Sequence, residues 1–520
     1  MDDSNGSVAG AAPIKRLCWD SLSATNLRSG SQKQKSPVAC GMMDERQSFR
    51  WRNLRSHDDH EALLLITSEC CFLINYRHRN VGHSCTFQSI TKARHQGASP
   101  SRTFLNDHNA INHSATMKKT IYLIAWTFAA ISCYGQGGTY QRIEFKLDYR
   151  FGFQIQQKVR SDTVAWKYQL SAADYAAKGD YRNALIQWDL QGTSDQSFTK
   201  NEVDFINRTY SRVSAADYIV QRSKYHQVII INEAHHNSLH RFFTRFLLQG
   251  LYDNGYRHLG LEALNNGKSR DSLLSQRGYP VQNSGFYTKD PQFGELIRTA
   301  LAMGFHVFPY ERTTASNGKQ REIEQARNIQ EVMKQYPGEK FLIHCGFSHV
   351  MEGTVSSWEK AMAGRLSEFT GIDPLTINQV ANSEKSRPEY NNPFLKALNI
   401  QESAVLLDEQ GNPVRYEDGE SWADIAVFHP NTEYVSNRPR WLFRRENRSV
   451  ELDVSGVDIS FPLMVLAYRK GEDISQAVPA DITEVEDRNE TPVLALKKGT
   501  YDIVVVNNQG EAGGSVLEVR

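Results

Sequence analysis

The sequence predicts an α/β fold: a mostly parallel, layered sheet with an N-terminal helical segment and a C-terminal antiparallel β-sandwich. Three observations support this prediction. Short β-branched runs alternate with amphipathic helical segments between residues 226 and 445. Two helical segments joined by a Gly-Asp turn precede them, and a period-two pattern of apolar residues dominates after residue 446.

A secretory signal peptide is predicted at residues 117–135. Met117 is followed by two lysines, an apolar core too short for a transmembrane span, and small residues. Residues 1–116 hold five of the seven cysteines and lack sustained periodicity. We therefore expect translation to begin at Met117 and the preceding extension to be disordered. The alternative is a genuine cytosolic extension with an internal membrane anchor.

The mature chain is expected to be exported, to the periplasm, the outer membrane or the medium. Cys133 is a candidate lipid anchor, although cleavage after Gly135 fits the sequence as well. Cys345 would then be the one certain cysteine, so no internal disulfide is expected. A net charge of +1 without a Lys/Arg cluster argues against nucleic acid as a partner and leaves a small-molecule or peptide substrate.

Residues 137–225 are predicted to form a strand followed by helices. Apolar residues alternate with polar ones from Ile143 to Ile155, which indicates one long half-buried strand. Residues 165–178 and 181–189 resemble a single tetratricopeptide hairpin, which we interpret as packing against the main domain. A further helix is expected at residues 202–222.

The main domain, residues 226–445, opens with a β-α-β unit. Val228–Ile231 is a continuous β-branched run, residues 239–251 carry one apolar helix face, and residues 258–261 form the next strand. The remaining elements are helices at 291–303 and 323–336 and strands at 305–309, 340–343 and 425–428. Residues 265–287 lack periodicity and are interpreted as a loop over the strand edge.

Residues 446–520 are predicted to form a small β-sandwich. Short alternating strands are separated by Lys-Gly and Gln-Gly turn signals. No cluster of acids and bases lies in this part of the sequence. We interpret it as a separately folding module outside the functional site.

Titratable residues gather where the predicted strands end, at the edge where open parallel sheets form their sites. The set comprises Glu233, His235, His236, Arg241, Glu262, Tyr310, Glu311, Arg312, His344 and His349. An imidazole beside a carboxylate can activate water, and an arginine can stabilise a developing oxyanion. Any one of these residues could simply be solvated or ion-paired, but their convergence at one edge favours a site.

The motifs of this domain resemble those of the erythromycin esterase/ChaN/TraB–Tiki superfamily. The resemblance covers residues 226–430 and is carried by Asn232-Glu-Ala-His-His236 with Arg241, by Leu261-Glu262, by Arg321-Glu322 with Ala326 and Asn328, and by the segment 341–349 that ends in His349. Asn232 replaces the usual glycine of that family. The family includes an esterase, metal-dependent proteases and a haem-binding protein, so the resemblance alone does not fix the reaction.

The resemblance implies an exported hydrolase in which a histidine activates water to cleave an ester or amide. The esterase branch spaces the motif Glu-x-x-His with an Arg five residues later, which favours His236 as the base; the ChaN spacing, Glu-x-His, would select His235. The expected catalytic residues are His236, Glu233, Glu262, Arg241 and His349. The expected substrate-binding residues are Tyr310, Arg312 and His344.

The alternative on the same fold is a non-catalytic protein that binds haem or a divalent metal. Mn, Zn or Fe would be held by His235, Glu233, Glu262 and His349. No compact motif such as His-Glu-x-x-His supports a metal, so this hypothesis rests on the resemblance. A third alternative, a scaffold without activity, is suggested only by Asn232. Cys345 is not expected to be a nucleophile, because most lone cysteines are buried and inert.

Overall fold

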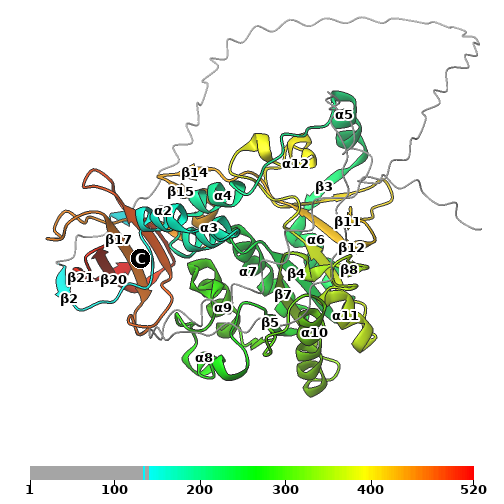
Figure 1. Ribbon diagram of the computed structural model, residues 1–520, viewed down its shortest axis with the longest axis horizontal. Helices are drawn as coiled ribbons and strands as arrows, with labels where there is room; N and C mark the ends of the chain where they lie inside the picture. The colour runs from blue at the N-terminus through cyan, green and yellow to red at the C-terminus, as the bar shows by residue number, and fades with distance from the viewer. Residues whose placement is uncertain (1–132, 135–139) are drawn as a thin grey trace, which may run out of the picture. The chain divides into compact units, whose positions relative to one another are not determined.

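An eight-stranded, mostly parallel sheet forms the centre of the fold (Figure 1). The computed structural model describes residues 133–134 and 140–520. The predicted extension at residues 1–116 lies outside the described residues, as does the predicted signal peptide apart from Cys133–Tyr134 (β1). No helix within the described part of the chain is long and apolar enough to cross a membrane.

Six neighbouring strands of the central sheet run parallel, and two antiparallel pairings complete one side. The strand order is β3-β10-β13-β9-β4-β7-β5-β6. The parallel strands are β4 (Val228–Glu233), β5 (Tyr256–Leu261), β6 (His306–Pro309), β7 (Lys340–Gly346), β9 (Leu375–Asn378) and β13 (Ile425–Phe428). β10 (Ala404–Leu407) pairs antiparallel with both β13 and β3 (Ser211–Ser214). The predicted mostly parallel sheet is confirmed.

Helices cover the sheet and bury its β-branched strands. α7 (Ser238–Asp253) packs with α6 (Ala215–Ser223) and α9 (Pro291–Ala302), in one apolar core with Ile229 and Ile231 of β4. α10 (Gly318–Gln335) packs with α11 (Met362–Thr370). Every residue of β4 is buried, as its continuous apolar run predicts for a central parallel strand.

The N-terminal segment contains more helix and less strand than the sequence predicts. It comprises β2 (Gln141–Ile143), α2 (Gly152–Ser161), α3 (Lys167–Ala177), α4 (Tyr181–Asp189) and α5 (Lys200–Thr209). The predicted long strand to Ile155 is wrong. The alternation in burial continues to Tyr149 without a ladder partner, and α2 then begins where the side chain of Gln154 accepts a hydrogen bond from the backbone N–H of Phe151.

The predicted helix at residues 202–222 is also wrong, because β3 interrupts it. α5 ends at Thr209, β3 pairs with β10, and Ser214 caps the next helix by accepting a hydrogen bond from Asp217 N. The apolar spacing continues through both helices, so periodicity alone did not reveal the break. The tertiary pairing with β10 decided the backbone conformation.

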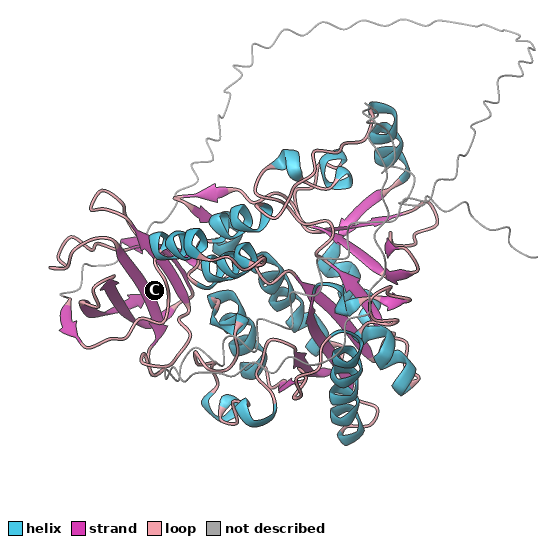
Figure 2. Cartoon of the chain, viewed as in Figure 1, coloured by secondary structure: helices cyan, strands magenta, loops and turns pink. Residues whose placement is uncertain are grey.

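The C-terminal strands pair antiparallel in two sheets, as predicted (Figure 2). Their strands are β16 (Arg448–Glu451), β17 (Leu463–Arg469), β18 (Asp481–Val485), β19 (Val493–Leu496), β20 (Gly499–Asn507) and β21 (Ala512–Val519). β2 completes one sheet by pairing with β21, and β1 joins the other by pairing parallel with β16. The sandwich is therefore built from the start of the described chain as well as its end.

Short elements occupy the connections. These are α8 (Leu274–Arg277), α12 (Pro393–Ala397), β8 (Glu352–Gly353), β11 (Tyr416–Asp418), β12 (Ser421–Ala423), β14 (Tyr434–Val435), β15 (Arg438–Pro439), and the 3-10 turns η4 (Gly267–Ser269), η5 (Tyr287–Lys289), η6 (Phe347–Val350), η7 (Pro388–Tyr390) and η8 (Arg440–Phe443). Two of them, η5 and η6, border the carboxyl ends of the parallel strands.

Candidate functional site

The carboxyl ends of four adjacent strands bring the predicted titratable residues to one edge of the sheet. Glu233 ends β4 and lies in register with Gly346 at the end of β7. Glu262 directly follows β5, Glu311 follows β6 by two residues, and His349 lies in η6 directly after β7. Because these strands are parallel neighbours, the side chains meet although they are far apart in the sequence.

The first half of the edge is organised by Arg241 of α7. Its guanidinium donates two hydrogen bonds to Glu233, at 2.7 and 2.9 Å, and one to the backbone carbonyl of His235 at 2.8 Å. It also pairs with Asp290, which accepts a further hydrogen bond from Ser238. Arg241 is 1% exposed, and these contacts occupy its three nitrogens. It therefore holds the turn after β4 in place and is not directed at a reacting oxygen.

The adjacent histidines differ in their partners. His235 Nδ1 lies 2.9 Å from Oε1 of Glu233. Because an ionised carboxylate only accepts hydrogen bonds, Nδ1 is the donor, and the neutral ring then carries its lone pair on Nε2. His236 instead stacks on Trp188, with 3.9 Å between ring centroids, and its buried Nδ1 has no hydrogen-bond partner among the described residues. The carboxylate–imidazole pair expected of a general base is thus made by His235.

The second half of the edge is organised by Arg321 of α10. Its Nη2 donates to Glu262 at 2.6 Å and to Glu311 at 2.6 Å. His349 Nδ1 donates to Glu322 at 2.8 Å, and its Nε2 lies 2.9 Å from Arg321 Nη1 and 3.3 Å from Glu262 Oε1. The neutral ring accepts a hydrogen bond from the arginine, whereas the imidazolium donates to Glu262.

Gly346 joins the two halves. A Cβ atom at this position would lie 2.6 Å from Nε2 of His235 and 3.5 Å from Oε2 of Glu262, so both groups approach the same α-carbon. Its backbone N–H donates to Glu262. Glycine is required here because any side chain would displace the imidazole ring. The imidazole of His235 is therefore directed toward the second carboxylate of the edge.

The charged residues at the strand edge lower the pKa values of Glu233 and Glu262 and raise the pKa of His349. Burial alone would raise the pKa of Glu233, but the Arg241 guanidinium and the hydrogen bond from His235 hold it well below its usual range. Burial likewise opposes ionisation of Glu262, yet His349 and Arg321 lower its pKa to about 2. Burial would lower the pKa of His349, but Glu262 and Glu322 raise it. Both carboxylates are ionised at neutral pH, and the positive form of His349 is favoured.

Two of the residues predicted to bind substrate are buried away from the edge surface. Tyr310 is fully buried, and its hydroxyl donates to the backbone carbonyl of His344 at 2.8 Å. His344 is buried 3.8 Å from Glu233, and burial lowers its pKa to about 4. Arg312 is half-buried and donates to the carbonyl of Thr314.

The contacts of the edge do not fit a divalent metal. Each oxygen of Glu233 accepts a hydrogen bond from Arg241, and each oxygen of Glu262 accepts one from Arg321 or Gly346. Each of these oxygens thus already accepts a hydrogen bond from a positive or N–H group, which competes with a divalent cation for the oxygen. Among the described residues, no group of three or more His, Cys, Asp or Glu side chains is arranged to hold a metal ion. We derive no step through a metal.

Several contributors to the edge were not included in the predicted site. Arg321 and Glu322 lie in the resembling motif and could have been included on that signal. Asp290 and Trp188 had no such signal, because one precedes α9 and the other lies in the hairpin of the N-terminal segment. Only the tertiary structure brings them to the strand ends.

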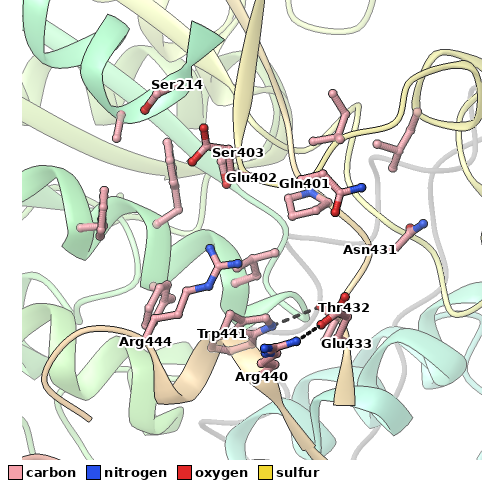
Figure 3. A pocket seen from close by; sticks show the side chains of 18 of the residues that line it. Ser214, Gln401, Glu402, Ser403, Asn431, Thr432, Glu433, Arg440, Trp441 and Arg444 are labelled. Atoms are coloured by element: carbon pink, nitrogen blue, oxygen red, sulfur yellow. Dashed lines mark hydrogen bonds and ion pairs between the residues drawn. The ribbon is translucent and has the colours of Figure 1, made fainter. Parts of the chain in front are cut away.

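A separate pocket of about 660 Å³ is lined in part by residues of α7, but by neither His235 nor His236 (Figure 3). Leu239, Phe242 and Trp441 contribute apolar surface, and Arg444 and Glu402 lie among its polar residues. None of its lining residues is a histidine. Without a proton-transfer group beside a carboxylate, this pocket is not the candidate catalytic site.

No family model and no curated protein matches the sequence. Among solved structures, the type III effector HopBA1 is 14% identical, with a TM-score of 0.28 over 43% of this chain and 96% of that chain. RRSP, a MARTX toxin effector domain from Vibrio vulnificus, is 15% identical, with a TM-score of 0.25 over 44% and 45%. The C-terminal region of Pasteurella multocida toxin is 10% identical, with a TM-score of 0.25 over 70% and 57%. At these TM-scores the similarities assign no family and no activity to the chain.

Proposed function

We propose that the protein is a hydrolase that cleaves an ester or amide bond with water activated by His235. The observation that carries this proposal is the contact between His235 Nδ1 and Glu233, in a cluster that also contains Glu262, Arg321 and His349. A carboxylate that fixes the tautomer of an imidazole and stabilises its protonated form is the arrangement that general-base catalysis requires. The motif resemblance to the erythromycin esterase/ChaN superfamily agrees with this class of reaction.

In the proposed reaction, Nε2 of His235 accepts a proton from water while the water oxygen attacks the carbonyl carbon. Negative charge develops on the carbonyl oxygen as the tetrahedral intermediate forms. The tetrahedral intermediate then loses its alcohol or amine as the C–O or C–N bond breaks. The proton on His235 passes to that leaving group, which restores the neutral imidazole.

This proposal assigns the base to His235, whereas the sequence favoured His236. His236 has no carboxylate partner among the described residues and stacks on Trp188. Burial, with Lys385 nearby, lowers its pKa well below the usual range. Such a ring is a weak proton acceptor. The contacts of His235 therefore support it as the base.

The test compares His235→Gln with His236→Gln on a panel of activated esters and small amides. We expect His235→Gln to lower kcat by roughly two to four orders of magnitude, the usual contribution of a general base. His236→Gln is the matched control and should change kcat by less than about tenfold. Equal loss in both variants, or loss in His236→Gln alone, would overturn the assignment.

The same preparation distinguishes the non-catalytic alternative. A bound haem gives an intense Soret absorbance band, and elemental analysis reports a bound metal. If the wild-type protein carries haem stoichiometrically and hydrolyses none of the substrates, the hydrolase proposal is wrong.

A further inference from the structure

Three aromatic side chains from separate parts of the chain surround the two histidines. Tyr287 stacks on His235 with 3.9 Å between ring centroids, and Phe347 meets His235 edge-on at 5.0 Å. Trp188 lies nearly parallel to Phe347 at 5.4 Å, in addition to its stack on His236. Trp188, Tyr287 and Phe347 are all half-buried residues, and their rings contact the two histidines or one another.

Phe347 has an unfavourable backbone conformation. Its φ is 39°, in the left-handed region that bulky L-residues rarely adopt. Its ring does not gain complete burial in return, because the residue is only half-buried. Packing alone therefore does not explain why a phenylalanine is kept here, where glycine would adopt the same backbone without strain. Strained backbone of this kind is found where function requires a fixed side-chain position.

Asn232 holds this conformation. It is completely buried at the penultimate position of β4, and its Nδ2 donates to the carbonyl of Phe347 at 2.7 Å. Its Oδ1 accepts from the backbone N–H of Gln379 at 2.8 Å. Both ends of a buried amide are thus used to fix the turn that presents the Phe347 ring. This gives a structural role to the residue by which the motif departs from the resembling family.

The hairpin of α3 and α4 places Trp188 in the same group. Asp189, the next residue, accepts a hydrogen bond from the backbone N–H of Ser386 at 2.6 Å and lies 3.9 Å from Lys385. Tyr181, at the start of α4, is within 3.5 Å of Asp290, the partner of Arg241. The hairpin is therefore anchored to the site on two sides, and its contribution extends beyond packing.

We propose that Trp188, Tyr287 and Phe347 form a subsite for a flat aromatic group of the substrate. Aromatic rings attract other aromatic rings through stacked and edge-on contacts that an aliphatic group of equal size does not make. The subsite would hold the aromatic group next to the bond that His235 hydrolyses, and in this respect the inference rests on the proposed function. The predicted substrates are aryl-substituted esters or amides.

The test measures binding of two probes of nearly equal size, N-acetyl-phenylalanine amide and N-acetyl-cyclohexylalanine amide. Isothermal titration calorimetry on the wild-type protein should give a Kd about two- to tenfold lower for the aromatic probe, the range expected for one or two ring contacts. Chromatography before and after each titration shows whether the probe stays intact. Any cleavage is removed by repeating the titration with Glu233→Gln, which lacks the carboxylate partner of His235.

Two variants and one control locate the effect. Trp188→Ala and Phe347→Gly should each reduce the preference for the aromatic probe to less than about twofold. Phe347→Gly also relieves the backbone strain, which offsets part of the stability lost with the ring contacts. Phe205→Ala removes a 46% exposed phenylalanine of α5 and should leave the preference unchanged.

Equal binding of the two probes by the wild-type protein would overturn the subsite, as would a preference that survives in both Trp188→Ala and Phe347→Gly. If the aromatic preference falls in these variants but the protein hydrolyses none of the substrates, the subsite stands and the hydrolase proposal is wrong. If hydrolysis depends on His235 but the wild-type protein shows no aromatic preference, the hydrolase proposal stands and the subsite is wrong.

Discussion

Two regions of this protein bury arginines against carboxylates, and only one of them contains histidines. At the strand edge, Arg241 and Arg321 bind Glu233 and Glu262. Where the sandwich meets the other elements, Arg298 of α9 makes two hydrogen bonds to Glu472, at 2.7 and 2.6 Å, and Arg469 makes two to Glu295. Arg438 of β15 likewise binds Asp481 of β18 at 2.6 and 2.7 Å.

Buried charge alone therefore does not identify a functional site. The sandwich pairs consist of arginines and carboxylates whose charges satisfy one another across the packed elements. At the strand edge, the same type of pair positions a titratable ring: Glu233 carries His235, and Glu262 lies beside His349. We infer that the first set stabilises the fold, whereas the second supports chemistry. The following predictions separate these roles.

The largest expected effect is that of Glu233→Gln on turnover. The amide keeps the size of the side chain but loses the charge that stabilises the His235 imidazolium, so kcat should fall by roughly two to four orders of magnitude. Glu472→Gln makes the same chemical change in a sandwich pair and should leave kcat of the folded protein unchanged. Steady-state kinetics with the best ester or amide of the panel measures both. Similar losses in the two variants would remove the distinction between the regions.

Arg438→Ala should produce the opposite pattern, with lower stability and unchanged turnover. The substitution leaves Asp481 buried without its positive partner, and breaking a buried pair in this way costs about 3–5 kcal/mol. Urea unfolding followed by circular dichroism measures the free energy of unfolding, and kcat is measured on the folded fraction at low temperature. Arg438→Met fills the space without restoring charge, so it should be nearly as destabilising. A large fall in kcat without a loss of stability would place Arg438 in the functional region.

Whether the sequence alone could assign a residue to the strand edge or to a sandwich pair depends on where that residue lies in the chain. Glu233, Glu262, Glu311 and His349 lie at or within three residues of the ends of parallel strands, and the strand pattern alone brings them to one edge. The choice between His235 and His236 depends on side-chain direction in an irregular turn, which sequence spacing does not fix. Asp290 and Trp188 reach the edge from segments without a strand-end signal. The partners of Arg298 and Arg438 lie 174 and 43 residues away in sequence, so no local pattern reveals them.

Acidification should lower the free energy of unfolding, because His344 is buried in its neutral form at the strand edge. Burial keeps His344 neutral by lowering its pKa to about 4, whereas the unfolded chain binds a proton near pH 6.5. Between these values the unfolded state binds more protons, so the free energy of unfolding should fall as pH decreases, by on the order of 3 kcal/mol for this group.

Urea unfolding at pH 7.5 and pH 4.5 tests this pH dependence. His344→Gln should show a smaller difference between the two pH values than the wild type, because the titrating ring is gone. Phe205→Ala, which removes no titrating group, serves as the control and should keep the full difference. If His344→Gln shows the same pH dependence as the wild type, groups other than His344 cause the acid sensitivity.

The smallest expected effect is that of Cys345→Ser, which tests whether the thiol belongs to the functional region at all. Cys345 lies in β7 between His344 and Gly346, yet its side chain is 1% exposed and its Sγ is 3.7 Å from the carbonyl of Ile231. Burial raises the pKa of the thiol well above its usual range, with Glu262 adding to the effect, so the nucleophilic thiolate is scarce. Serine keeps the size and can donate to the same carbonyl, and we expect a loss of stability of about 1 kcal/mol and a change in kcat of less than about twofold. Alkylation with iodoacetamide should likewise leave the native protein active, because the reagent requires an accessible thiolate. If Cys345→Ser abolishes turnover while His235→Gln does not, a thiol mechanism must replace water activation, and the distinction between the two charged regions no longer rests on the histidines.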